Sequence, residues 1–300
     1  MPAEGIHLTA LREATASSIL DAPVRQRLLR RDDAARFGAI LADLPYFHQY
    51  ALVVVRYVTG APAKPSTWGA SIHDGGAVAL LGSLLAIARR ERDAELAAIA
   101  LGLASHCTID RALHPLITAL ARLHHGGKTH DASHREVEKF QSICFHEQYL
   151  GRDTMGTSMI TRYLTIHLAS GLDARLLGWL REAWADGLGS APPARMLAGF
   201  VRGYRAHVRL LGTPLGKRIA PPAAKDQARP RYLHGSWGSF ESLLEHAVAR
   251  SVAVLNAAGA MLEVGDHDLG AARAALTRLL PAGTIDPQGE HLDLTRPVAI

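Results

Sequence analysis

Cysteine and aromatic residues are scarce in this chain of 300 residues. Only Cys107 and Cys144 are present, so the sequence has neither a disulfide framework nor a Cys-rich zinc motif. Any metal ion must therefore be held by histidine and carboxylate. Aromatic residues make up 6% of the chain, and runs of β-branched residues are short, so the composition favours helices over strands. We expect an all-α fold.

Long hydrophobic runs are also missing. The most apolar windows, residues 50–58 and 77–88, are shorter than the about 20 residues that a membrane-spanning helix needs. The N-terminal residues 1–7 combine neither a basic start nor a continuous apolar stretch, which a secretory signal would have. We expect a soluble, cytoplasmic protein.

Positive charge exceeds negative charge, but it is dispersed. The formal net charge is +5 and the pI is near 9.4, which suits an anionic partner such as a phosphodiester or a transiently contacted membrane surface. Basic residues are scattered and do not alternate with aromatic residues as in a nucleic-acid groove, so we expect no nucleic-acid partner. A solvated surface explains most of the basic residues.

Apolar periodicity and Pro/Gly breaks divide the chain into three parts. Residues 1–212 read as a helical core, residues 213–235 as an exposed loop or lid rich in Pro, Lys and Arg, and residues 236–300 as C-terminal helices packed on the core with an unassigned tail. Helices are predicted over residues 9–20, 23–31, 34–42, 46–59, 77–91, 93–124, 133–150, 154–171, 173–187, 193–212, 238–263 and 267–280.

Histidines concentrate between residues 106 and 138, which hold six of the sixteen in the chain. His106, Asp110 and His114 are spaced four residues apart, so on a helix they form one stripe of two imidazoles and a carboxylate. This stripe follows the apolar residues 101–105, where unpaired polar groups would be costly to bury. A metal ion is the economical partner for such a buried set.

A second stripe, His134 and Glu138, lies on the next predicted helix. Imidazole nitrogen and carboxylate oxygen are suitable zinc ligands, and two such stripes on facing helices can converge on metal. His124, His125 or His130 could replace one of these ligands, or could be a polar helix end. His146-Glu147, two turns beyond Glu138, could support the ligands or serve the packing.

Short motifs occur in a fixed order over residues 5–150. They are Gly5-Ile6-His7, residues 38–44 (GAILADL), Ile72-His73-Asp74, residues 101–110 (LGLASHCTID) with His114-Pro115, and His134-x3-Glu138. Each motif alone is common, but the ordered set resembles the zinc-dependent phospholipase C family, a helical superfamily that includes S1/P1-type nucleases. The resemblance implies a multi-helix bundle of that type.

The same resemblance implies a cleft with two or three zinc ions. One ion would be held by Asp43, His73, His106 and Asp110, and another by His114, His134 and Glu138. Asp110 would also bridge to a third ion that His7 binds. Asp43 would orient or deprotonate the attacking water, so Asp43 and Asp110 are the expected catalytic residues. Tyr46 and Phe47, which follow Asp43, are placed to wall a substrate pocket.

The resemblance implies zinc-dependent hydrolysis of a phosphodiester, either a phospholipid or a related small phosphate ester. Two alternatives remain open. A cytoplasmic zinc enzyme of a biosynthetic pathway could act on a non-phosphate metabolite, because a fold does not fix a substrate. Otherwise, the zinc could stabilise a helical binding protein without catalysis. The sequence gives no oligomeric state.

Overall fold

Helices form almost all of the regular structure. The computed structural model describes residues 4–59, 66–126, 130–168, 172–287 and 292–298, and the predicted all-α class is confirmed over these residues. The helices of the first half are α1 (Glu4–Ala16), α2 (Ala22–Arg30), α3 (Asp32–Ala39), the 3-10 turn η1 (Leu44–Phe47), α4 (Tyr50–Thr59), α5 (Thr67–Ser71), the π-helical turn η2 (Ile72–Gly76), α6 (Ala77–Glu91) and α7 (Ala94–His125).

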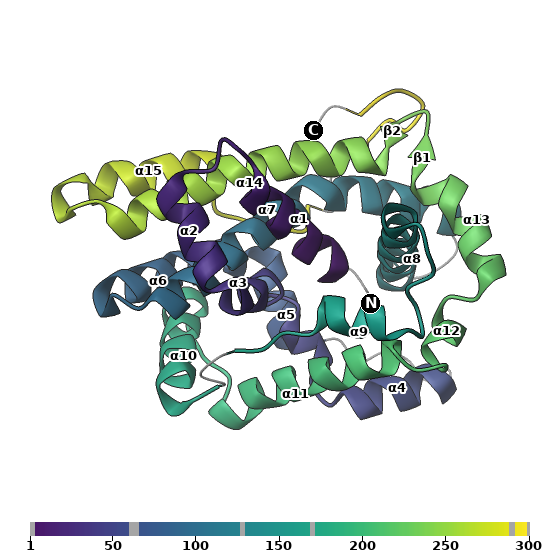
Figure 1. Ribbon diagram of the computed structural model, residues 1–300, viewed down its shortest axis with the longest axis horizontal. Helices are drawn as coiled ribbons and strands as arrows, with labels where there is room; N and C mark the ends of the chain where they lie inside the picture. Colours follow the sequence, from purple (N-terminus) through teal and green to yellow (C-terminus); the bar gives the residue numbers. More distant parts are fainter. Residues whose placement is uncertain (1–3, 60–65, 127–129, 169–171, 288–291, 299–300) are drawn as a thin grey trace.

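The second half continues the helical architecture and adds one small hairpin. Its elements are α8 (His130–Leu150), α9 (Ser158–Leu164), α10 (Ala174–Leu188), α11 (Ala194–Leu211), α12 (Gly216–Ile219), α13 (Pro222–Tyr232), β1 (His234–Gly235), β2 (Gly238–Ser239), α14 (Phe240–Glu263), η3 (Asp266–Asp268) and α15 (Leu269–Leu279). The two strands pair antiparallel, with His234 opposite Ser239. In Figure 1, α14 and α15 run along the top of the molecule, and α11 and α4 run along the bottom.

The long helix α7 forms the centre of the fold. It packs against α3, α6, α8 and α14, and most of its residues from Glu95 to Ala121 are buried. The Asp93 side chain caps its first turn by accepting a hydrogen bond from the backbone N–H of Leu96 at 2.8 Å. The helix continues through Pro115, although a proline inside a helix usually bends or breaks it. Side chains from α7 can therefore meet residues from several other helices.

Two glycines bring α3 unusually close to α7. A Cβ atom on Gly38 would lie 2.0 Å from the backbone oxygen of Ile99, and one on Gly102 would lie 2.0 Å from that of Ala35. Any side chain at these positions would push the helices apart. The close approach brings the C-terminal end of α3, and Asp43 just beyond it, to the histidine stripe of α7.

Several predicted boundaries need correction. Residues 213–235 were expected to form an exposed loop, but they contain α12 and α13. Lys225 explains the difference, because its ammonium group donates to both carboxylate oxygens of Glu147 on α8, at 2.9 and 2.8 Å. This buried ion pair attaches α13 to α8. The first helix begins at Glu4, earlier than predicted, and the helix expected over residues 154–171 is shortened to α9.

Two helical stretches are long and apolar enough to cross a membrane by length and composition, Thr67–Glu91 and Ala94–His125. The first stretch is longer than the apolar window of residues 77–88 that the sequence showed, because α5 and η2 precede α6 without a break. Within the apolar window of the second, 94% of residues are buried inside the protein, against 44% in the first. The position of α7 in the protein core accounts for its apolar composition.

Candidate metal centre

The predicted stripe on α7 lies in the protein interior. The side chains of His106, Asp110 and His114 are between 0% and 8% exposed. His106 Nδ1 lies 2.8 Å from the backbone oxygen of Ala39, at the end of α3. This hydrogen bond places one proton on Nδ1 and directs Nε2 at Asp110, 2.9 Å away. The close contact of α3 with α7 thus fixes the orientation of His106.

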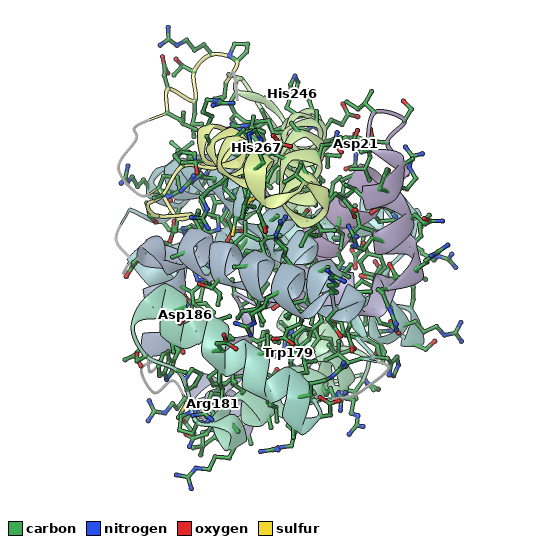
Figure 2. The ribbon with its side chains drawn as sticks, turned by 90° about the vertical axis from the view of Figure 1, so that its left-hand side faces the viewer. Asp21, Trp179, Arg181, Asp186, His246 and His267 are labelled. Atoms are coloured by element: carbon green, nitrogen blue, oxygen red, sulfur yellow. The ribbon has the colours of Figure 1, made fainter. Side chains whose placement is uncertain are left out.

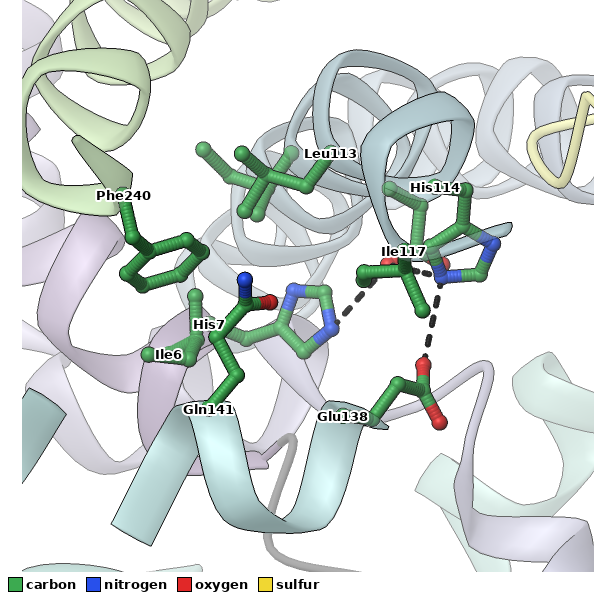
Figure 3. A pocket seen from close by; sticks show the side chains of 10 residues that line it. Ile6, His7, Leu113, His114, Ile117, Glu138, Gln141 and Phe240 are labelled. Carbon is green, nitrogen blue, oxygen red and sulfur yellow. Dashed lines mark ion pairs between the residues drawn. The ribbon is translucent and has the colours of Figure 1, made fainter. Parts of the chain in front are cut away.

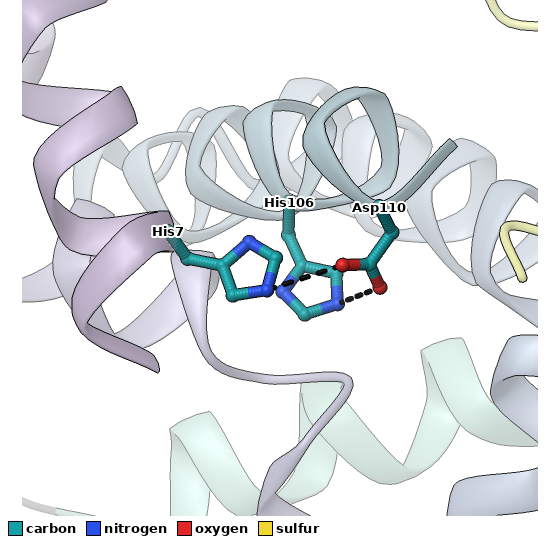
Figure 4. A group of neighbouring side chains, drawn as sticks. All are labelled: His7, His106 and Asp110. Atoms are coloured by element: carbon teal, nitrogen blue, oxygen red, sulfur yellow. Dashed lines mark ion pairs between the residues drawn. The ribbon is translucent and has the colours of Figure 1, made fainter. Parts of the chain in front are cut away.

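The two carboxylate oxygens of Asp110 face different histidines. Oδ2 lies 2.9 Å from His106 Nε2 and 3.5 Å from His73 Nε2. Oδ1 lies 3.2 Å from His7 Nε2 and 3.4 Å from His114 Nε2. Figure 4 shows His7 and His106 approaching the carboxylate from α1 and α7, with their rings stacked at a centroid distance of 4.0 Å. Asp110 is therefore shared between two sets of imidazoles.

Asp43 and His73 complete one side of the cluster. Asp43 follows α3 directly before the Leu44-Pro45 turn, and its Oδ1 lies 3.4 Å from His73 Nε2. Its other oxygen, Oδ2, lies 3.9 Å from His7 Nε2. His73 sits in the π-helical turn η2, where its Nδ1 contacts the backbone oxygen of Gly69 at 2.9 Å. The backbone of η2 is kinked at Gly75, whose φ is 152°, a conformation that favours glycine.

His134 and Glu138 approach the other side of Asp110 from α8. Glu138 Oε1 lies 3.4 Å from His114 Nε2 and 3.5 Å from His134 Nε2. The rings of His114 and His134 meet edge to face, with centroids 5.0 Å apart. Figure 3 shows His7, His114 and Glu138 converging on one region. The structure thus brings together all eight residues that the sequence singled out as ligands.

The acidic groups in this cluster are held in their charged form. Burial opposes ionisation of Asp110, but the neighbouring charges of His106, His114 and His7 hold its pKa well below the usual range. The same balance lowers the pKa of Glu138, where burial is outweighed by His134 and His114. Burial would lower the pKa of His73, but hydrogen bonds to Asp110 and Asp43 raise it to about 10. The carboxylates are therefore charged, and protonated imidazoles such as His73 balance them where no metal ion is bound.

Three groups of side chains could each hold a metal ion, with ligand atoms within 4.8 Å of one another. They are His7, His106 and Asp110; Asp43, His73 and His106; and His114, His134 and Asp286. Among the described residues, buried atoms without a hydrogen-bond partner include His7 Nδ1, His106 Nε2 and Asp110 Oδ2. Two of these three atoms, His106 Nε2 and Asp110 Oδ2, face the cluster and each other at 2.9 Å, and without a hydrogen-bond partner both remain available to an ion.

Asp286 and Glu4 were missed by the sequence analysis. Asp286 comes from the tail that had no assignment, and its Oδ1 lies 2.9 Å from His114 Nδ1. Glu4 is 1% exposed at the start of α1, and burial, reinforced by the negative charge of Asp43, raises its pKa to about 8. An isolated Asp in a segment without periodicity carries no sequence signal. Glu4 lies three residues before His7 on α1, but the first helix was predicted to begin only at residue 9, so the shared face was not foreseen.

The other histidines lie elsewhere. His125 Nε2 contacts the hydroxyl of Tyr232 at 2.6 Å, and the His124 ring packs on the same tyrosine, so neither replaces a ligand. The side chain of His130 lies outside the described residues. His146 bonds to Thr9 and Ser142, between α1 and α8, and so serves the packing. His207 is buried beside Phe47, while His167, His234 and His246 are exposed; Figure 2 labels His246 on α14.

A small, partly open pocket lies beside the cluster, with room for about one or two water molecules. It is lined by polar residues, namely His7, Asp110, His114, Glu138 and Gln141, and by apolar residues that include Ile6, Leu113, Ile117 and Phe240 (Figure 3). Tyr46 packs against His73 with ring centroids 5.5 Å apart, but it is not among the residues that line this pocket. Phe47 instead packs in the core against Tyr204.

Comparison with known proteins gives no relative. No family model, curated protein or solved structure matches the chain. The candidate site is therefore interpreted from its own geometry.

Proposed function

We propose that this protein is a zinc-dependent hydrolase that cleaves a phosphodiester with activated water. The observation that carries the proposal is the position of Asp110 between two sets of histidines, one at each carboxylate oxygen. A carboxylate that bridges neighbouring metal ions needs this arrangement. A single structural metal site would need one such set, with a closed coordination shell.

The spacing of the donor atoms fits zinc. Two donors that are each about 2.1 Å from one tetrahedral zinc ion lie about 3.4 Å apart. The distances from His73 Nε2 to Asp43 Oδ1, and from His114 Nε2 to Glu138 Oε1, are both 3.4 Å. Two other contacts of the cluster are at hydrogen-bond distance, His106 Nε2 to Asp110 Oδ2 at 2.9 Å and His7 Nε2 to Asp110 Oδ1 at 3.2 Å. The 3.4 Å pairs are therefore the ones already spaced to hold an ion between them.

The residues that would hold the ions divide into three sets that share Asp110. Asp43, His73, His106 and Asp110 would hold one ion; His114, His134 and Glu138 a second; and His7 with Asp110 a third. Bound zinc ions lower the pKa of a water molecule and polarise phosphoryl oxygens. His73 and His106 are suited to this role because backbone oxygens fix their Nδ1 protons, which leaves Nε2 as the donor.

Asp43 is the proposed base. Its side chain is 14% exposed, whereas those of His7, His106 and Asp110 are at most 5% exposed. Water can therefore reach Asp43 more readily than its neighbours. One of its oxygens faces His73 and the other faces His7, so the carboxylate is held in place to orient a water molecule and accept its proton.

The pocket beside the cluster supports an ester with an apolar part. A phosphate group would lie against the polar lining residues, where bound metal ions would offer positive charge. An alkyl group would lie against the apolar lining residues Ile6, Leu113 and Phe240. A phospholipid or a related small phosphate ester combines these two features, and it is the proposed substrate class.

Turnover of phosphodiesters by the metal-loaded chain tests the proposal. Zinc-loaded protein should hydrolyse a chromogenic phosphodiester or a phospholipid in vesicles, lose this activity with a chelator and regain it with zinc. Asp43→Asn should lower turnover by at least about 100-fold, while Asp33→Asn, an exposed carboxylate on α3, should leave it unchanged. A fully zinc-loaded wild-type chain that turns over none of these substrates would contradict the proposal and favour a non-phosphate metabolite.

A further inference from the structure

The C-terminal segment Gly283 to Asp286 is fastened across the candidate metal centre. The backbone oxygen of His73 accepts two hydrogen bonds from it, one from the Thr284 hydroxyl at 2.8 Å and one from the backbone N–H of Ile285 at 3.0 Å. Ile285 itself is fully buried. The segment is thus anchored on η2, the turn that presents His73 to the cluster.

A second anchor comes from α7. Arg111, the residue after Asp110, donates from Nε to the backbone oxygen of Thr284 at 3.2 Å and from Nη2 to that of Gly283 at 3.1 Å. The backbone N–H of Asp286 in turn donates to the Thr284 hydroxyl at 2.9 Å. Hydrogen bonds from two ligand-bearing elements therefore hold the backbone that carries Asp286.

The anchored segment aims Asp286 at His114. The Nε2 atom of His114 faces the cluster, 3.4 Å from both Asp110 Oδ1 and Glu138 Oε1. The opposite ring nitrogen, Nδ1, lies 2.9 Å from Asp286 Oδ1. His73 and His106 show the same division, with Nε2 facing the carboxylates and Nδ1 facing an outer acceptor. The outer acceptor of His114 differs from theirs because it is a charged carboxylate.

We propose that Asp286, which could also act as a ligand beside His114 and His134, is instead a positioning residue for the second metal-binding set. Its carboxylate lies at hydrogen-bond distance from His114 Nδ1 and would accept a proton on that nitrogen, which fixes the tautomer that presents Nε2 to the ion. A carboxylate in this outer position also makes the imidazole a stronger donor, and removing such a partner typically weakens metal binding by about 10–100-fold. The assignment rests on the proposed function, since it presumes that His114 binds metal. It gives the C-terminal segment a role in completing the site.

Zinc affinity of the full chain tests the assignment. Wild type, Asp286→Asn, Asp286→Ala and the control Asp293→Asn would be titrated with zinc against a chromophoric chelator. Asp293 is an exposed carboxylate of the same tail, bonded to Thr295, so its substitution removes the same charge away from His114. Asp286→Ala should weaken one zinc equivalent by about 10–100-fold without changing the number bound. Asp286→Asn should weaken it less, because an amide oxygen still accepts the Nδ1 proton.

Imidazole NMR gives a second readout that does not depend on affinity or activity. Zinc-loaded wild type should show a protected His114 Nδ1–H resonance that is retained but shifted in Asp286→Asn and lost in Asp286→Ala. Circular dichroism of the metal-free variants checks that each one folds.

Three results would overturn the assignment. Affinities of the Asp286 variants equal to that of Asp293→Asn would remove any role of the carboxylate. Loss of a whole zinc equivalent in both Asp286 variants would make Asp286 a direct ligand instead. A wild-type chain that binds no zinc would overturn the proposed function itself and this assignment with it. Zinc binding measured on the unsubstituted protein distinguishes that failure from the other two.

Discussion

His7 Nε2 lies 3.2 Å from Asp110 Oδ1, although the first residue belongs to α1 and the second to the middle of α7. The stacking of His7 on His106 reinforces this contact between the two helices. The opposite oxygen of Asp110 faces His73 and His106. A carboxylate with imidazoles at both oxygens is the feature that makes a multi-metal centre the best interpretation of this site.

Replacement of Asp110 by asparagine should abolish metal binding at more than one set. The amide keeps the size of the side chain but removes the charge that both sets share. We expect at least two zinc equivalents to be lost or weakened by elemental analysis after dialysis, with the helical circular dichroism spectrum retained. Asp33→Asn should keep the wild-type zinc content. Unfolding of the Asp110→Asn protein would instead indicate a structural role for this carboxylate.

Gly102 should be far more sensitive to substitution than another helical glycine. Gly102→Ala would place a Cβ atom 2.0 Å from the backbone oxygen of Ala35, so it should lower the unfolding free energy by about 1–3 kcal/mol and weaken zinc binding through His106. Gly82 on α6 has open space at its Cβ position, and Gly82→Ala should stabilise the protein by about 0.4–1 kcal/mol. Denaturant titrations measure both changes. Equal effects of the two substitutions would argue against the close contact of α3 with α7.

His146 should make stability depend on pH in the weakly acidic range. Burial lowers its pKa from 6.5 to about 4, so the folded chain takes up this proton later than the unfolded chain as the pH falls. The stability that this lowered pKa contributes is present above pH 6.5 and is lost progressively toward pH 4. Between pH 7 and pH 5 the loss lowers the unfolding free energy by about 2 kcal/mol. His146→Gln should flatten the pH dependence of the unfolding free energy by that amount. An unchanged slope would show that His146 does not remain neutral in the fold.

Lys225 should hold α13 against α8. Lys225→Met would leave the buried Glu147 carboxylate with Arg229, 3.1 Å away, as its remaining charged partner, so it should cost less than the about 3–5 kcal/mol of an uncompensated buried charge. Limited proteolysis should then cleave within residues 213–235 faster than in wild type. Lys217→Met, at an exposed position of the same segment, should show wild-type cleavage. Equal cleavage of both variants would restore the interpretation of this segment as a mobile lid.

Local patterns predicted the elements that carry the metal centre. The predicted helices over residues 77–91 and 93–124 nearly coincide with α6 and α7, because apolar periodicity and the Asp93 cap define them locally. The four-residue spacing of His106, Asp110 and His114 likewise determines a shared face once the helix exists. Convergence of these residues with His7 and Asp43 came from the ordered motifs, since spacing within one helix does not determine how helices pack.

Features that depend on contacts between distant segments were missed. Residues 213–235 looked like a loop because they are rich in Pro and charged residues, yet Glu147 of α8 compensates the charge of Lys225. Asp286 had no neighbouring pattern to distinguish it, and its place depends on Arg111 and the backbone of His73. In both cases the deciding partner is remote in sequence.

Diffraction at the zinc absorption edge, from crystals grown with zinc, tests the central claim most directly. The account predicts at least two anomalous peaks, one bonded to His73 and His106 and one bonded to His114 and His134. One carboxylate oxygen of Asp110 should lie next to the first peak, and its other oxygen should face a neighbouring ion. A fully zinc-loaded crystal with a single peak that is coordinated only by protein ligands would contradict the account. A fully zinc-loaded crystal with no peak near Asp110 would contradict it as well.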